Sequence, residues 1–96
     1  MVELQPGQLV RSLAGRDKDE HYLVLREIDD QYVYLVNGHN RPVSKPKKKN
    51  KAHIQHYDRR VDLKELVETG KLNDSQVIEY LRKLLVPETE VSEEEV

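Results

Sequence analysis

Residues 22–36 read YLVLREIDDQYVYLV, and this stretch decides the fold. It contains two apolar runs, 22–28 and 32–36, and both are rich in the β-branched and aromatic residues that strands favour. Only Asp29-Asp30-Gln31 separates the two runs, so they pair most simply as an antiparallel hairpin. The chain is therefore expected to be built around a β-sheet.

The flanking sequence extends this sheet on both sides. Residues 9–13 predict a preceding strand, joined to the hairpin through the small and charged loop 14–20. After the hairpin, Asn37-Gly38 supplies a turn, and Pro42 prevents further ladder pairing. Residues 53–57 predict a short fourth strand.

From Val61 onward the apolar period becomes helical, and two helix starts follow each other. Asp62 is expected to be the N-cap of a first helix, with Glu65 as its capping-box partner, and Gly70 ends that helix. Asn73 and Gln76 repeat the capping pattern, so a second helix is expected to begin at Asp74. Its apolar side chains follow one stripe, formed by Val77, Ile78, Leu81, Leu84 and Leu85.

Composition limits the chain to one small core. It has 96 residues, of which 36% are hydrophobic, and no cysteine. No apolar run is long enough to span a membrane, and the first ten residues lack the features of a signal peptide. We therefore expect a cytoplasmic protein without disulfides or a thiolate metal site.

The formal net charge of −2 conceals a strong segregation. Residues 41–61 contain eight Lys and Arg against one Asp, whereas residues 86–96 contain five Glu and no basic residue. Local charge rather than net charge sets the surface potential, so the basic segment can attract a polyanion. We expect residues 87–96 to be an acidic, disordered tail.

Residues 43–51 form the densest part of the basic segment and are predicted to be an exposed, mobile loop. Lysines neutralise phosphates with little demand on geometry, which indicates contact with an RNA backbone rather than sequence readout. The candidate RNA-binding residues are Arg41, Lys45, Lys47, Lys48, Lys49, Lys51, His53, His56, Arg59 and Arg60. Tyr57 is the favoured stacking residue, whereas Tyr22, Tyr32 and Tyr34 are expected to pack within the sheet.

Residues 7–28 contain a strand, the glycine-containing charged loop 14–18 and a second apolar strand, and this unit resembles the KOW motif of ribosomal and transcription-elongation proteins. Its short motifs are Gly7-Gln8-Leu9-Val10, Ala14-Gly15-Arg16-Asp17 and Tyr22-Leu23-Val24-Leu25. Within that group the pattern is most similar to the family of large-subunit ribosomal protein fourteen from archaea and eukaryotes. The resemblance covers residues 7–57, and Asp19 stands where the family commonly has a second small residue.

This resemblance implies a small SH3-like β-barrel that binds RNA through its loops. It implies that Gly15 shapes the first loop, that Arg16 joins the RNA-binding residues, and that ribosomal RNA is the partner. The resulting expectation is a mainly β protein with a C-terminal α part. It comprises a barrel over 1–60 with its basic loop 43–51, a helical hairpin over 61–86 packed on the barrel, and the acidic tail.

Other classes of function have less support in the sequence. His53 and His56 would point to opposite faces of a strand, so no metal site is expected. No nucleophile motif or glycine-rich phosphate loop is present, so the chain is not expected to be an enzyme or to use a cofactor or small-molecule substrate. The alternative is a protein adaptor that binds its partner through the C-terminal helices or a barrel edge.

Overall fold

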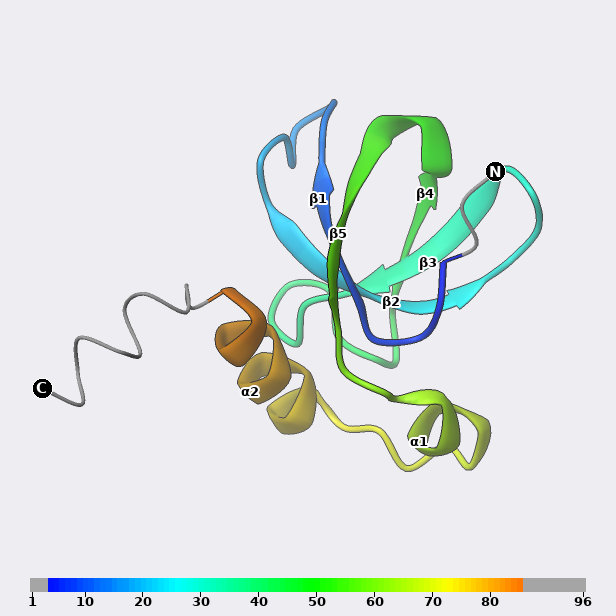
Figure 1. Ribbon diagram of the computed structural model, residues 1–96, viewed down its shortest axis with the longest axis vertical. Helices are drawn as coiled ribbons and strands as arrows, with labels where there is room; N and C mark the ends of the chain where they lie inside the picture. The colour runs from blue at the N-terminus through cyan, green and yellow to red at the C-terminus, as the bar shows by residue number, and fades with distance from the viewer. Residues whose placement is uncertain (1–3, 86–96) are drawn as a thin grey trace, which may run out of the picture.

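The computed structural model describes residues 4–85, and the predicted acidic tail lies outside this range. Its strands are β1 (Gln8–Ser12), β2 (His21–Glu27), β3 (Tyr32–Val36), β4 (Lys47–Asn50) and β5 (Ile54–Arg60). The 3₁₀ turn η1 (Lys51–His53) joins β4 to β5, and the helices α1 (Lys64–Glu68) and α2 (Asp74–Leu85) follow. A mainly β chain ending in two helices is therefore confirmed (Figure 1).

The five strands form one antiparallel sheet in the order β4-β3-β2-β1-β5. The predicted hairpin of β2 and β3 is confirmed, with Leu23 opposite Val36 and Glu27 opposite Val33. A register shift between Val24 and Arg26 places a bulge in β2, which increases the local twist. The fourth predicted strand is longer than expected, because β5 continues to Arg60 alongside β1.

The two edge strands of the sheet meet at η1, although they stand at opposite ends of the strand order. The Lys51 N–H donates to Gln31 O at 2.8 Å, which prolongs the pairing of β4 with β3. The Leu13 N–H donates to His53 O at 2.8 Å, which prolongs the pairing of β1 with β5. The sheet is therefore strongly curled, with an inner and an outer face (Figure 1).

Both faces of the curled sheet are buried around the middle of β2, which explains the continuous apolar run over residues 22–25. Side chains of the inner face form one cluster, made of Leu4, Val10, Tyr22, Val24, Val33 and Leu35. Side chains of the outer face pack with the helices in a second cluster, made of Leu9, Leu23, Leu25, Val36, Leu63, Leu72, Val77 and Leu81. Because strand side chains alternate between faces, neighbouring residues of β2 enter different clusters.

The second helix begins with the predicted capping box. The Gln76 N–H donates to Asn73 Oδ1 at 2.8 Å, and the Asn73 N–H donates to Gln76 Oε1 at 3.0 Å. The predicted stripe is used for the core, since Val77 and Leu81 are buried beneath the helix against the sheet. This helix is therefore held both by its local sequence and by its packing.

The first helix begins differently from the prediction. Its N-cap is Leu63, which provides no side-chain cap, and Asp62 instead accepts from the Lys64 N–H at 3.1 Å. The buried position of Leu63 in the outer cluster moves the helix start one residue beyond Asp62. The end is as predicted, because Gly70 has a φ of 68° and the Lys71 N–H donates to Leu66 O at 2.9 Å, as in a Schellman motif.

Gly7 lies in close backbone contact with Val61, in the segment that leads to α1. Its φ is +90°, and a Cβ built on it would lie 1.7 Å from Val61 O. We expect Gly7→Ala to lower the free energy of unfolding by roughly 3 kcal/mol, since the steric overlap adds to the cost of a left-handed conformation. Urea denaturation followed by circular dichroism measures this loss.

Gly70→Ala is the matched control, because Gly70 also has a positive φ but a Cβ there meets nothing within 4 Å. This variant should lose only about 1 kcal/mol, the cost of the left-handed backbone alone. Equal losses for the two variants would show that the contact with Val61 does not constrain Gly7.

Candidate nucleic-acid interface

The predicted lysine loop is partly a strand, which corrects the expectation of a mobile loop over residues 43–51. Lys47 lies opposite Leu35 and Lys49 lies opposite Val33, both of which belong to the inner cluster. Residues opposite each other in a sheet share a face, so Lys47 and Lys49 project inward and Lys48 projects outward. Lys49 is buried, with 8% of its surface exposed.

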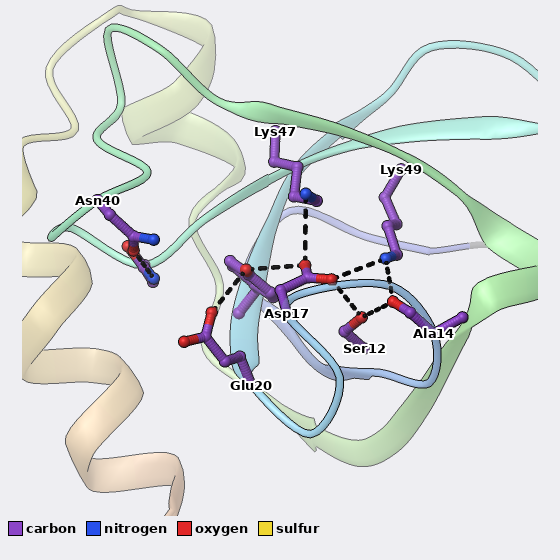
Figure 2. Close-up of polar contacts among 9 residues, drawn as sticks. Ser12, Ala14, Asp17, Glu20, Asn40, Lys47 and Lys49 are labelled. Atoms are coloured by element: carbon purple, nitrogen blue, oxygen red, sulfur yellow. Dashed lines mark hydrogen bonds and ion pairs between the residues drawn. The ribbon is translucent and has the colours of Figure 1, made fainter.

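Asp17, from the loop between β1 and β2, makes this burial possible. Its Oδ1 lies 3.0 Å from Lys49 Nζ and its Oδ2 lies 3.6 Å from Lys47 Nζ (Figure 2). Lys49 Nζ also donates to Ala14 O at 2.9 Å, and Ser12 Oγ donates to Asp17 Oδ1 at 2.9 Å. The buried charges are thus paired and hydrogen-bonded, as buried ions require.

Tyr22 completes this cluster from β2, with its Oη donating to Asp17 Oδ2 at 2.9 Å. Burial acts to raise the pKa of Asp17, but the hydrogen bonds from Lys49, Ser12 and Tyr22 and the charge of Lys47 outweigh it and hold that pKa well below its usual value. Burial and the hydrogen bonds to Asp17 and Glu20 raise the pKa of Tyr22. Asp17 is therefore ionised and Tyr22 neutral at physiological pH.

Lys51 forms an ion pair with a second carboxylate, that of Glu27. Its Nζ lies 2.5 Å from Glu27 Oε2, which also accepts from the Leu4 N–H at 3.2 Å. Burial acts to raise the pKa of Glu27, but these two hydrogen bonds and the charge of Lys51 lower it overall. Lys47, Lys49 and Lys51 are thus paired with carboxylates of the same chain.

The outer face of β2, β3 and β4 carries the exposed cations of this region. Arg26 lies opposite Tyr34, and Tyr34 lies opposite Lys48. The Arg26 guanidinium lies 5.1 Å from the centre of the Tyr34 ring, and Lys48 Nζ lies 4.5 Å from the centre of the Tyr32 ring. Both distances are typical of cation–π contacts, so each tyrosine orients a cation on the sheet surface.

The sequence did not single out Arg26. It interrupts the apolar run of the second strand, and that interruption was the available signal. Its placement beside Lys48 depends on the pairing of β2, β3 and β4, which is a tertiary property.

The loop between β3 and β4 contributes Arg41 and Lys45 at the same edge of the sheet. Lys45 is exposed and Arg41 is half-buried. The loop is fixed to the start of α2, because the Val43 N–H donates to Asp74 Oδ1 at 2.8 Å and Gly38 leaves no room for a Cβ beside Ile78. The loop is therefore held against the fold.

The remaining predicted residues lie elsewhere. His56 and Arg60 are exposed on β5, at the opposite end of the strand order, and His53 is exposed on η1, between β4 and β5. Arg59 donates to Leu84 O at 2.8 Å, and Arg60 lies 3.6 Å from Asp62. The sheet therefore separates the predicted site into a β4 group and a β5 group.

The first loop has the conformation expected of a glycine-dependent turn. Gly15 has a φ of 88°, and Asp19 has a φ of 74°. Aspartate tolerates this left-handed conformation better than most residues, so the turn forms without a second glycine. Arg16, next to Gly15, is exposed on this loop.

Residues 4–85 contain no group of three or more His, Cys, Asp or Glu side chains placed to hold a metal ion. No helix within these residues is long and apolar enough to cross a membrane. No protein-family model matches the chain, and no curated protein matches it. The function must therefore be inferred from the arrangement of the side chains.

Replacing Asp17 tests the cluster that folds the lysine segment. Asp17→Asn leaves Lys49 buried without a counter-charge, so we expect a loss of roughly 3 kcal/mol in the free energy of unfolding at pH 7. The lowered pKa means that the carboxylate stabilises the fold fully above its unfolded value of 3.8 and progressively less as the pH falls below it. The difference between wild type and variant should therefore shrink between about pH 4 and about pH 2.

Urea titrations across that pH range provide the measurement. Asp62→Asn is the control, because the Asp62 side chain is 77% exposed and its ion pair with Arg60 spans 3.6 Å. It should change stability by less than about 0.5 kcal/mol. A variant at Asp17 that unfolds like this control would refute the role of the cluster.

Proposed function

We propose that the chain is a non-enzymatic RNA-binding module of the cytoplasm, and that it contacts ribosomal RNA. The observation that carries the proposal is the row Arg26, Tyr34 and Lys48 on the outer face of the sheet, with Lys48 also over Tyr32. Arg41 and Lys45 extend this row along the loop before β4. These five residues and Tyr32 form the proposed RNA-binding surface.

The expected contact is with phosphates and the shape of a structured RNA. The facing cations engage the rings of Tyr32 and Tyr34, so these rings orient charge and are not free platforms for bases. Lysine and arginine at a phosphate backbone provide affinity without sequence readout. A stem-loop therefore suits this surface better than an unpaired strand.

We also propose that the curled sheet is an SH3-like barrel of the KOW type. The junction of its two edges at η1 and the filled inner cluster support this. The left-handed Gly15 supports the resemblance in the first loop. The proposal assigns the inward lysines, Lys47 and Lys49, to folding instead of RNA contact.

Salt dependence tests the number of phosphate contacts. The four cations of the RNA-binding surface are Arg26, Arg41, Lys45 and Lys48. They predict a slope of about −3.6 for the logarithm of affinity against the logarithm of salt concentration. Affinity for a fluorescein-labelled RNA stem-loop should then fall about a hundredfold between about 50 and about 200 mM salt. Fluorescence anisotropy measures it, and a flat response would refute binding through this surface.

Variants locate the contact. Lys45→Ala/Lys48→Ala should reduce the salt slope by about two, because two phosphate contacts are lost. Lys71→Ala/Lys83→Ala removes the same charge from exposed lysines on the helical side and should leave the slope unchanged. Co-sedimentation of both variants with purified ribosomal subunits tests the ribosomal target, and pelleting of the wild type with neither subunit would remove it.

A second candidate function, a protein adaptor, has one specific observation in its favour. A groove of about 510 Å³ lies between β2 and α1, lined mainly by Pro6, Leu25, Val43, Leu66, Val67 and Leu72. An apolar groove of this kind can accept a peptide. The second helix is not available for this role through Val77 and Leu81, because both are buried against the sheet.

The adaptor function predicts a different response from RNA binding. Val67→Lys, which places a charge in the groove, should abolish binding of a protein partner, whereas Lys45→Ala/Lys48→Ala should retain it. Pull-downs with the wild type and both variants compare these outcomes. Loss of the partner in the lysine variant would contradict binding through the groove.

A further inference from the structure

Part of the outer face of the sheet is not covered by the helices. His21 lies opposite Arg11, and Arg11 lies opposite Gln55, so these residues form a row across β2, β1 and β5. Tyr57 stacks on His21 with ring centres 5.8 Å apart, and Leu13 is 40% exposed beyond them. We call Arg11, Leu13, His21, Gln55 and Tyr57 the open outer face.

Arg11 carries the positive charge of this face, and it forms no ion pair with a carboxylate among residues 4–85. Its Nη2 donates to Gln55 Oε1 at 2.9 Å, which is a neutral partner. Its Nε is buried and has no hydrogen-bond partner among the described residues. A partly buried guanidinium held this way favours an incoming carboxylate, since charge-assisted hydrogen bonds are stronger than neutral ones.

The C-terminal end of α2 lies next to the open outer face. Arg59 of β5 donates to Leu84 O at 2.8 Å, and Tyr57 and Leu84 both pack against the outer cluster. The chain therefore leaves the described region next to β5. The following residues, 86–96, contain five Glu and no basic residue.

We propose that this acidic segment docks on the open outer face, with its carboxylates beside Arg11. Glu88, Glu90 and Glu93 stand three, five and eight residues beyond Leu85. An extended chain carries them roughly 10 to 26 Å from the end of α2. Gln55, which lies next to Arg11, is four residues from Arg59, or roughly 13 Å along β5. The acidic segment is therefore long enough to bring its carboxylates to Arg11.

This docking is independent of the proposed RNA contact. Arg11 and His21 lie on β1 and β2 near β5, whereas the RNA-binding surface lies at the β4 edge. The segment does not need to leave its site for Lys48 to reach a phosphate. Failure of one proposal therefore leaves the other intact.

His21 provides an internal probe of the docking. Burial and the charge of Arg11 lower its pKa, and Asp19 acts in the opposite direction. A carboxylate docked beside Arg11 favours the protonated imidazole, so it raises this pKa. Neutralising the segment should therefore lower the pKa of His21.

The experiment compares three full-length proteins by NMR without RNA. They are the wild type, Glu88→Gln/Glu90→Gln/Glu93→Gln, and the control Glu65→Gln/Glu68→Gln/Glu79→Gln, which removes the same charge from exposed helix residues. We expect the pKa of His21 and the Arg11 side-chain resonances to change only in the first variant, and to lose this difference at high salt. Equal values in all three proteins, or equal changes in both variants, would overturn the docking.

Discussion

The ion pair of Asp17 with Lys49 is the interaction on which the organisation of this protein depends. It joins the first loop to the edge strand β4 at a separation of 3.0 Å, beside the apolar cluster of the inner face. Without a carboxylate there, a segment with lysines at 47, 48 and 49 would have to keep all three in water. With it, the segment becomes a strand and forms one edge of the curled sheet. Ser12 and Tyr22 hold Asp17 in place, so the pair has a fixed geometry.

The same interaction divides the basic segment by function. Strand alternation sends Lys47 and Lys49 inward to Asp17 and sends Lys48 outward, where it meets Tyr32. Lys51 forms an ion pair with Glu27. The lysines of the basic segment, which look alike in the sequence, are thus divided between pairing inside the fold and the surface proposed for RNA. The proposed RNA contact consequently uses fewer lysines than the charge of the segment suggests, and it includes Arg26 from a neighbouring strand.

The helices contribute to the site by supporting the sheet. Their apolar residues cover Leu9, Leu23 and Leu25 on the outer face, and Asp74 fixes the loop that carries Arg41 and Lys45. Because α2 covers only part of this face, the sheet keeps two separate exposed regions. One lies at the β4 edge and is proposed for RNA, and the other surrounds Arg11 and is proposed for the acidic segment. The short α1 leaves an apolar groove beside β2, and Arg26 of the surface proposed for RNA also lines this groove.

The sequence alone determined the features that depend on neighbouring residues. The hairpin of β2 and β3, the capping box at Asn73 and the end of α1 at Gly70 all follow from spacings of a few residues, and the structure has them. It did not determine the start of α1, because burial of Leu63 outweighed the local cap at Asp62. Nor did it determine which lysines are free. Lys49 and Asp17 are 32 residues apart in the sequence. The lysine run looks like a solvated loop, and only the pairing of β4 with β3 places Lys49 beside the buried carboxylate of Asp17.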